Sequence, residues 1–333
     1  MEQKPKLPSI EYIVLVAMLT SIVALATDVM LPALDIIGED LNAPRPNDVH
    51  YIVTIFFLGY AIGQLIAGPL SDTIGRKPAI YIGYVILVIG CIISMLTESW
   101  TIMLAARLLQ GIGAASPRIV TMALIRDEHA GRPMARIMSI VMAVFILVPI
   151  VAPAIGQGLI YMGGWPLTFA GLMVLAIAVS IWFALRQPET LAPENRRPFN
   201  PKKLGAGGVE VIKTRAALGY TLAAGCIFGA FMGYLGSAAQ IFKQAFEVGD
   251  LFAFYFAVAA MALGVSSLTN AAFVMRLGMY RLSLTALVGL TVLSFAFWLI
   301  LPMFEGIPPL WLFLAWQLAA FFCVGITFAN INA

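Results

Sequence analysis

Long apolar segments alternate with short polar segments along the whole chain. A helix needs about 20 apolar residues to cross about 30 Å of hydrocarbon, and ten segments reach that length. They lie near residues 12–32, 51–70, 78–97, 100–124, 137–160, 166–185, 217–240, 251–270, 283–302 and 309–330. This pattern predicts an all-α polytopic membrane protein with about ten transmembrane helices.

The composition supports the same class. The 333 residues are 61% apolar and 11% charged, whereas a soluble domain is about half apolar and about a quarter charged. The formal net charge of +3 is small, and its distribution follows membrane topology, so nucleic-acid binding is not supported. We expect the lipid bilayer to be the main surrounding of this chain.

The basic residues indicate an orientation, because cytoplasmic loops of membrane proteins are enriched in Lys and Arg. With the N-terminus in the cytoplasm, Arg45 and Lys243 fall on the outer side, and Arg107 and Arg118 lie within the fourth segment. The other 16 of the 20 basic residues fall on the cytoplasmic side: Lys4, Lys6, Arg76, Lys77, Arg126, Arg132, Arg136, Arg186, Arg196, Arg197, Lys202, Lys203, Lys213, Arg215, Arg276 and Arg281. The first apolar segment is too long for a signal-peptide core, so we expect it to remain as a helix of the cytoplasmic (inner) membrane.

The residues that usually carry metal or hydrolytic chemistry are scarce. The three cysteines lie inside apolar segments without short spacings, and the two histidines lie in predicted loops. This supply does not suit a disulfide framework, a metal site or a Ser/His/Asp hydrolase. We therefore expect no enzyme, no metal and no cofactor.

A Pro-, Gly- and Arg-rich stretch divides the chain. It predicts an N-terminal six-helix bundle over 1–185, a cytoplasmic linker over 186–216 and a C-terminal bundle over 217–333. The loop around Gly278 resembles the loop around Gly75, and these glycines lie 278 − 75 = 203 positions apart. Transporters are often built from two repeated halves, and a chain with a complete second half would need about 390 residues, so we expect a design that lacks its last two helices.

The loop after the second segment reads Gly68-Pro-Leu-Ser-Asp-Thr-Ile-Gly-Arg-Lys-Pro78. It resembles the loop signature of the major facilitator superfamily. The strings Arg107-Leu-Leu-Gln-Gly111 and Ala152-Pro-Ala-Ile-Gly156 are similar to its fourth-helix motif and to the fifth-helix motif of its antiporters. The resemblance implies two helical bundles around a central cavity.

Two further strings narrow the resemblance. Thr27-Asp-Val-Met-Leu-Pro-Ala-Leu34 and the polar residues after the fourth segment look like the Bcr/CflA group of drug-resistance exporters. The antiporter motif departs from the family pattern, because Ala152 precedes its proline and Gln157 follows its final glycine. Pro153 and Gly156 still match, and with Pro149 we expect them to bend the fifth helix.

Asp28 is the one acidic residue well inside a predicted span. An ionisable group at membrane depth costs at least about 2.5–3.5 kcal/mol, and such a cost usually marks function. A carboxylate that binds and releases a proton as its surroundings alternate would couple transport to a proton gradient. The alternative is a carboxylate wetted at the outer surface, because Pro32 soon ends the helix.

Arg107 is the candidate partner of Asp28. At about 1.5 Å per residue, Asp28 lies about 24 Å above Tyr12, and Arg107 lies about 10 Å below the opposite face, so their depths are similar. We expect the two residues to share a proton-coupling cavity. The alternative role for Arg107 is a hydrogen-bond donor to backbone carbonyls at a helix contact.

The resemblance also implies a conformational latch at the cytoplasmic face, in which Asp72 and Arg76 hold the loop against Asp127 at the end of the fourth helix. Gly75 and Lys77 belong to the same loop. The alternative is a set of solvated charges worth about 0–1 kcal/mol for each pair.

Substrate contacts are expected from Gln110 and from aromatic side chains, although such rings more often simply pack. Those named for the cavity are Phe56, Phe57, Tyr60, Phe231 and Tyr234, with Phe228 beside them. The expected function is a monomeric proton-coupled antiporter that exports small amphipathic drugs, with the proton gradient as its energy source. The alternatives are a sugar or metabolite transporter on the same scaffold and a non-transporting sensor or truncated fragment.

Overall fold

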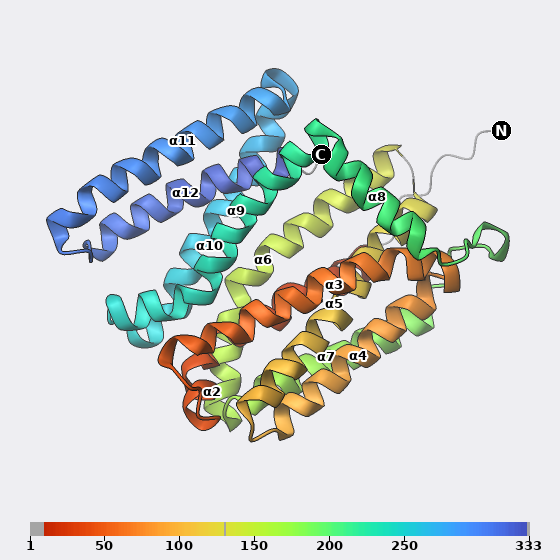
Figure 1. Ribbon diagram of the computed structural model, residues 1–333, viewed down its shortest axis with the longest axis horizontal. Helices are drawn as coiled ribbons and strands as arrows, with labels where there is room; N and C mark the ends of the chain where they lie inside the picture. The colour runs from red at the N-terminus through yellow and green to blue at the C-terminus, as the bar shows by residue number, and fades with distance from the viewer. Residues whose placement is uncertain (1–9, 130, 332–333) are drawn as a thin grey trace. The chain divides into compact units, whose positions relative to one another are not determined.

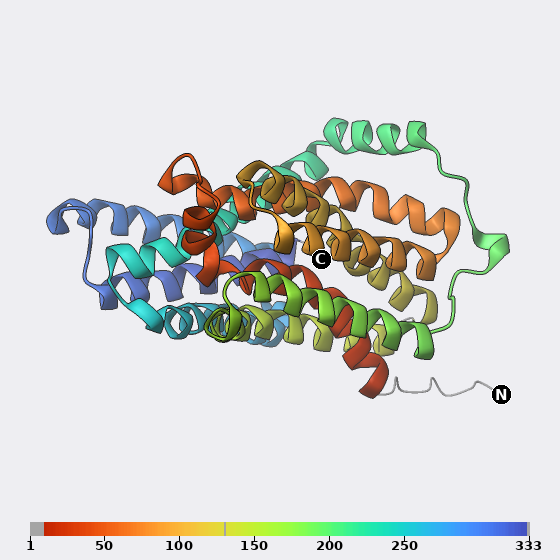
Figure 2. The ribbon, with the colours of Figure 1, turned by 90° about the horizontal axis from the view of Figure 1, so that it is seen from below.

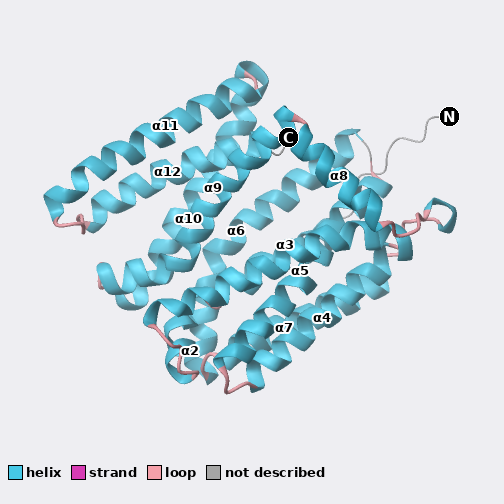
Figure 3. Ribbon diagram, viewed as in Figure 1, coloured by secondary structure: helices cyan, strands magenta, loops and turns pink. Residues whose placement is uncertain are grey.

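The computed structural model describes residues 10–129 and 131–331, and within these ranges all regular structure is helical (Figure 3). The chain divides into two compact units, with the boundary between Pro201 and Lys202. The predicted all-α class is confirmed.

The first unit contains seven helices, of which α2 to α7 are labelled in Figure 1. They are α1 (Ile10–Asp28), α2 (Leu34–Asp40), α3 (Tyr51–Ile74), α4 (Arg76–Leu96), α5 (Trp100–Glu128), α6 (Gly131–Gly163) and α7 (Pro166–Arg186). In the second unit, α8 (Pro201–Lys213) begins at the boundary and is followed by α9 (Arg215–Gln240), α10 (Phe252–Leu277), α11 (Met279–Ile300) and α12 (Leu310–Ile331).

Nine helical segments within the described residues are long and apolar enough to cross a membrane. Nine of the ten predicted segments correspond to them. The other prediction, 137–160, falls inside α6, whose side chains the structure describes only in part. Several helices continue past the predicted ends, because a helix can extend beyond the hydrocarbon; α5, predicted to end at 124, reaches Glu128.

The first apolar segment is interrupted, whereas the sequence predicted one continuous helix over 12–32. The helix α1 ends at Asp28, and a short 3-10 turn, Leu31–Ala33, separates it from α2. Pro32 lacks the N–H that would bond to the carbonyl of Asp28 in a continuing helix. Asp28 therefore lies at a helix break.

The centre of the first unit is α5, which packs closely against α3 and α4. Gly59 and Gly63 on α3 face the backbone of Leu108 and Ile112 on α5. A Cβ at Gly63 would lie 2.5 Å from the Ile112 carbonyl oxygen. Gly59 and Gly63, spaced as GxxxG, thus form the α3 side of a helix contact, as small residues permit.

Between the end of α7 and the start of α8 the chain is largely extended (Figure 2). The range 186–216, predicted as a linker, contains a 3-10 turn at Pro193–Asn195 and the helix α8. Residues 187–200 belong with the first unit, and α8 belongs with the second from Lys202 onward.

Candidate functional site

Arg107 lies at the contact of three helices of the first unit, with no exposed surface. Its Nε donates to the carbonyl oxygen of Ile52 on α3 at 3.0 Å, and its Nη2 donates to that of Ala26 on α1 at 3.2 Å. Ala26 belongs to the last turn of α1, where carbonyls lack helical partners and a cation is favourable. Arg107 therefore joins α5 to α3 and caps α1.

The same guanidinium is linked to a buried polar chain. Arg107 Nη1 donates to Gln110 Oε1, and Gln110 Nε2 donates to Ser94 Oγ on α4 at 2.8 Å. The ring of Phe56 lies 4.5 Å from the Arg107 guanidinium carbon, which is a cation–π distance. These contacts match the alternative role considered for Arg107, that of a hydrogen-bond donor to backbone carbonyls at a helix contact.

Asp28 is 2% exposed at the C-terminal end of α1. Arg107 reaches the backbone two residues before it, but no ion pair joins the two side chains in the part of the chain that the structure describes. The predicted similarity in depth thus agrees with the contact between Arg107 and the end of α1. A wetted carboxylate does not agree with an exposure of 2%.

Gly156 on α6 lies directly against the residue that follows Asp28. A Cβ at Gly156 would overlap the carbonyl group of Val29. Pro153 is buried on the same helix, whereas the side chain of Pro149 lies outside the described residues. The antiporter-like motif on α6 therefore packs against the break in the first membrane segment.

The residues predicted for the cavity belong to both units, and each group lies within its own unit. Phe56 and Gln110 are fully buried and partnered in the first unit, and Phe57 makes edge contacts with Phe56 and with Tyr60. Phe231 and Tyr234 belong to the second unit, where both make edge contacts with Phe321.

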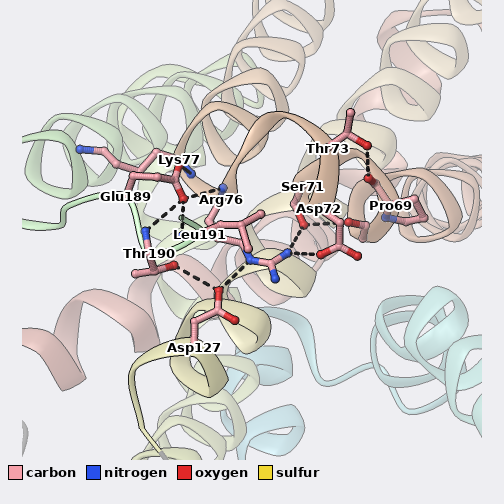
Figure 4. A network of polar contacts seen from close by, with 11 residues as sticks. Pro69, Ser71, Asp72, Thr73, Arg76, Lys77, Asp127, Glu189, Thr190 and Leu191 are labelled. Carbon is pink, nitrogen blue, oxygen red and sulfur yellow. Dashed lines mark hydrogen bonds and ion pairs between the residues drawn. The ribbon is translucent and has the colours of Figure 1, made fainter. Parts of the chain in front are cut away.

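A second polar cluster surrounds Arg76 at the start of α4 (Figure 4). Its Nε donates to Asp127 Oδ2 at 2.9 Å. Its Nη1 donates to Ser71 Oγ at 2.7 Å and to Asp72 Oδ1 at 2.6 Å. We call Asp72, Arg76, Asp127 and Glu189 the hairpin cluster, and it brings together all three charged residues of the predicted latch.

Glu189 is the member of the hairpin cluster that sequence reasoning missed. Its carboxylate accepts from the backbone N–H groups of Arg76 at 2.9 Å and Lys77 at 3.0 Å (Figure 4). It also accepts from the N–H groups of Thr190 and Leu191. The first turn of α4 has no side-chain cap of its own, so Glu189 supplies one from the segment after α7.

The charge state of Glu189 follows from these donors. Partial burial alone would raise the pKa of its carboxyl, but the four backbone N–H donors favour the charged form more strongly. The net result is a pKa below the ordinary value. The sequence signal that could have indicated this contact is an acidic residue, Glu189, shortly after the sixth apolar segment, on the same predicted side of the membrane as Arg76 and Lys77.

Gly75 makes room for this arrangement. Its φ is +107°, which favours glycine, and a Cβ there would lie 2.6 Å from Glu189 Oε2. Lys77 Nζ donates to the carbonyl oxygen of Ala184 on α7 at 3.3 Å. A cavity of about 590 Å³ borders the cluster, lined by Asp72, Arg76, Asp127, Leu191, Glu194, Asn195, Arg196 and Arg197.

Comparison of the sequence with known protein families identifies the family of this chain. The sequence profile of the Major Facilitator Superfamily matches residues 16–333. The chain belongs to this superfamily. The resemblance found in the loop and helix motifs is thereby confirmed, and the superfamily consists of transporters rather than enzymes, as predicted.

Curated relatives of this major facilitator chain include proteins named for drug resistance. It is 29% identical over 270 residues to the bicyclomycin resistance protein homolog of Haemophilus influenzae, covering 80% of this chain and 67% of that protein. It is 28% identical over 182 residues to multidrug resistance protein D of Escherichia coli K12, and the match covers 55% of this chain and 46% of that protein. The uncharacterized MFS-type transporter YdgK of Bacillus subtilis is 29% identical over 256 residues, and the match covers 75% of this chain and 62% of that protein. The chain thus spans about two thirds or less of the length of these relatives.

A solved structure supports the fold of the superfamily. The crystal structure of the human organic anion transporter MFSD10 (TETRAN) matches with a TM-score of 0.68 at 15% identity, covering 99% of this chain and 85% of that chain. At this identity the likeness shows the major facilitator fold alone.

Proposed function

We propose that this major facilitator chain is a proton-coupled antiporter that exports small amphipathic drugs or related compounds across the cytoplasmic membrane. Its relatives named for drug resistance support the substrate class. The distribution of basic residues supports a cytoplasmic N-terminus. Protons returning down their gradient would supply about 2.3 kcal/mol per 100 mV for each charge moved.

The observation that carries the proposal is the burial of Asp28 at the break in the first membrane segment. A carboxylate that is 2% exposed between an interrupted helix and the contact with Gly156 is costly unless it has a use. Interrupted membrane helices commonly form ion sites in transporters. Asp28 would bind a proton in one state and release it in the other.

Arg107 supports this role through the backbone rather than through an ion pair. Its contact with the Ala26 carbonyl fixes the end of α1, so movement of α5 against α1 would alter the surroundings of Asp28. Protonation of Asp28 would in turn change which arrangement of α1 is preferred. In this proposal, proton coupling depends on Arg107 and Asp28 both lying at the end of α1, and no direct ion pair between them is needed.

The test is transport into inverted membrane vesicles with an imposed proton gradient and ethidium as the probe. Asp28→Asn should abolish proton-driven uptake while the protein remains folded in the membrane, and Asp28→Glu should retain part of it. Asp35→Asn, at a less buried acid of α2, is the matched control and should leave uptake unchanged. Proton-dependent uptake by Asp28→Asn at the wild-type rate would contradict the proposal, and uptake of sugars instead of ethidium would favour the metabolite transporter.

A further inference from the structure

Gln317 on α12 is a buried amide that the second unit leaves without partners. Its side chain is 1% exposed, and neither Oε1 nor Nε2 has a hydrogen-bond partner among the described residues. Most buried polar side chains do have partners, and an orphaned amide destabilises the folded state. A primary amide in this position therefore needs an explanation.

A second polar group of this unit is equally isolated. The hydroxyl of Tyr234 on α9 is buried and, within the described residues, has no hydrogen-bond partner either. The ring of Tyr234 meets Phe321, one helical turn after Gln317 on α12, so the two polar groups lie near each other, yet they do not form a hydrogen bond of normal geometry. Gln317 offers one donor group and one acceptor, and the tyrosine hydroxyl offers both functions.

Aromatic rings surround this pair within the second unit. The ring of Tyr234 stacks with Phe256 of α10 at a centroid distance of 6.2 Å, and it meets Phe321 of α12 edge-on at 4.9 Å. Phe231 meets the same Phe321 ring at 5.5 Å. The two polar groups thus lie in surroundings that suit an aromatic compound.

The first unit provides a comparison for Gln317. Arg107 lies 107 − 100 = 7 residues after the start of α5, and Gln317 lies 317 − 310 = 7 residues after the start of α12. Both are buried polar residues at the same distance from the start of a membrane-spanning helix. Arg107 uses its donors on backbone carbonyls and on Gln110, whereas Gln317 has no such contacts among the described residues. Helix packing therefore explains the polar group in the first unit but not in the second.

We infer that Gln317 and Tyr234 form the hydrogen-bonding point at which the second unit recognises its transported compound. The recognised part is an aromatic ring bearing a group that both donates and accepts hydrogen bonds, such as an amide or a hydroxyl. The ring would pack among Phe231, Phe256 and Phe321, and its polar group would satisfy the Gln317 amide. This inference rests on the proposed export function and specifies its substrate class.

Two probes separate hydrogen bonding from ring packing. Chloramphenicol carries an aromatic ring with amide and hydroxyl groups, and tetraphenylphosphonium carries only rings and charge. Binding of each would be measured on the detergent-purified full chain, and uptake in inverted vesicles. Gln317→Leu should weaken chloramphenicol binding about tenfold, which corresponds to about 1.4 kcal/mol. It should leave tetraphenylphosphonium binding within twofold of wild type.

Two further variants complete the design. Tyr234→Phe keeps the ring and should weaken chloramphenicol binding several-fold without affecting tetraphenylphosphonium. Thr291→Val, a polar-to-apolar change at an exposed position of α11, is the matched control and should change neither probe. The midpoint of thermal unfolding should stay the same or rise in Gln317→Leu, because an unpartnered amide has been removed.

Each other outcome has a defined meaning. Equal weakening of both probes together with a lower unfolding midpoint would show a packing role for Gln317 and would overturn the inference. Unchanged binding of chloramphenicol by Gln317→Leu would overturn it as well. Absence of binding and uptake of both probes by the wild-type chain would instead refute the proposed function.

Discussion

The carboxylate of Glu189 lies 2.9 Å from the backbone nitrogen of Arg76, although the two residues are 113 positions apart in the sequence. A residue of the segment after α7 therefore completes the N-terminus of α4. Because Arg76 also holds Asp127 at the end of α5, this contact ties three parts of the first unit together. We expect the stability of this end of the unit to depend on the charge of Glu189.

Glu189→Gln removes that charge and should lower the midpoint of thermal unfolding in detergent by about 2–4 °C, equivalent to about 1 kcal/mol. Since the folded-state pKa is depressed, the stabilisation is fully present above the unfolded pKa of about 4.3 and is lost as the pH falls through the folded-state value. The difference between variant and wild type should therefore vanish in acid. Glu194→Gln, an exposed neighbour, is the control and should show no difference at neutral pH.

Arg76 and Asp127 should be energetically coupled. A double-mutant cycle with Arg76→Gln and Asp127→Asn, followed by thermal unfolding, should give a coupling free energy of about 1–2 kcal/mol, because the Arg76 side chain is 8% exposed and that of Asp127 is 25% exposed. The Arg186 and Glu11 pair is more exposed and should give a smaller coupling. Equal coupling in the two pairs would mean that the hairpin cluster is a set of solvated charges.

Gly156→Ala should impair transport more than its small change in volume suggests. The added Cβ would overlap the carbonyl of Val29 and displace the backbone next to Asp28. We expect at least a tenfold loss of proton-driven ethidium uptake at an unchanged level of protein in the membrane. Gly158→Ala has open space around its Cβ and is the matched control on the same helix. Similar uptake by the two variants would show that the motif on α6 has no part in proton coupling.

Arg107→Lys keeps the positive charge but cannot reproduce three directed contacts from one planar group. Backbone carbonyls of α1 and α3 would lose a donor, and the free energy of unfolding should fall by about 2 kcal/mol or more. Arg118→Lys on the same helix should cost less, since a partly exposed lysine can extend to the surface. Wild-type stability of Arg107→Lys would indicate that charge alone matters at this position.

Much of the fold could be predicted from the sequence because hydropathy acts locally. Each apolar segment that the structure describes is a helix, and the turn at Gly75 has the positive φ that the loop motif requires. The sequence placed the end of the first helix near Pro32, but it did not predict that the helix ends at Asp28 and that α2 follows, because a proline can end a helix or only bend it. The apolar pattern alone does not distinguish these outcomes.

The contacts of the candidate site were less accessible to sequence reasoning. Arg107 was matched with Asp28 by charge and depth, yet the structure directs its donors to the carbonyls of Ala26 and Ile52. Backbone carbonyls are present at every position and leave no mark in a sequence. Glu189 was missed for a related reason, because its four partners are backbone N–H groups.

The hydrogen bond from the backbone N–H of Arg197 to the carbonyl oxygen of Asp72, at 2.9 Å, gives the segment after α7 a second anchor on the first unit. Only residues 198–200 then separate this anchor from Pro201, where α8 begins. Three residues span at most about 10 Å when fully extended. We therefore expect a displacement of α8 that stretches these three residues to pull on the backbone of Asp72, so that the linker transmits movement to the hairpin cluster.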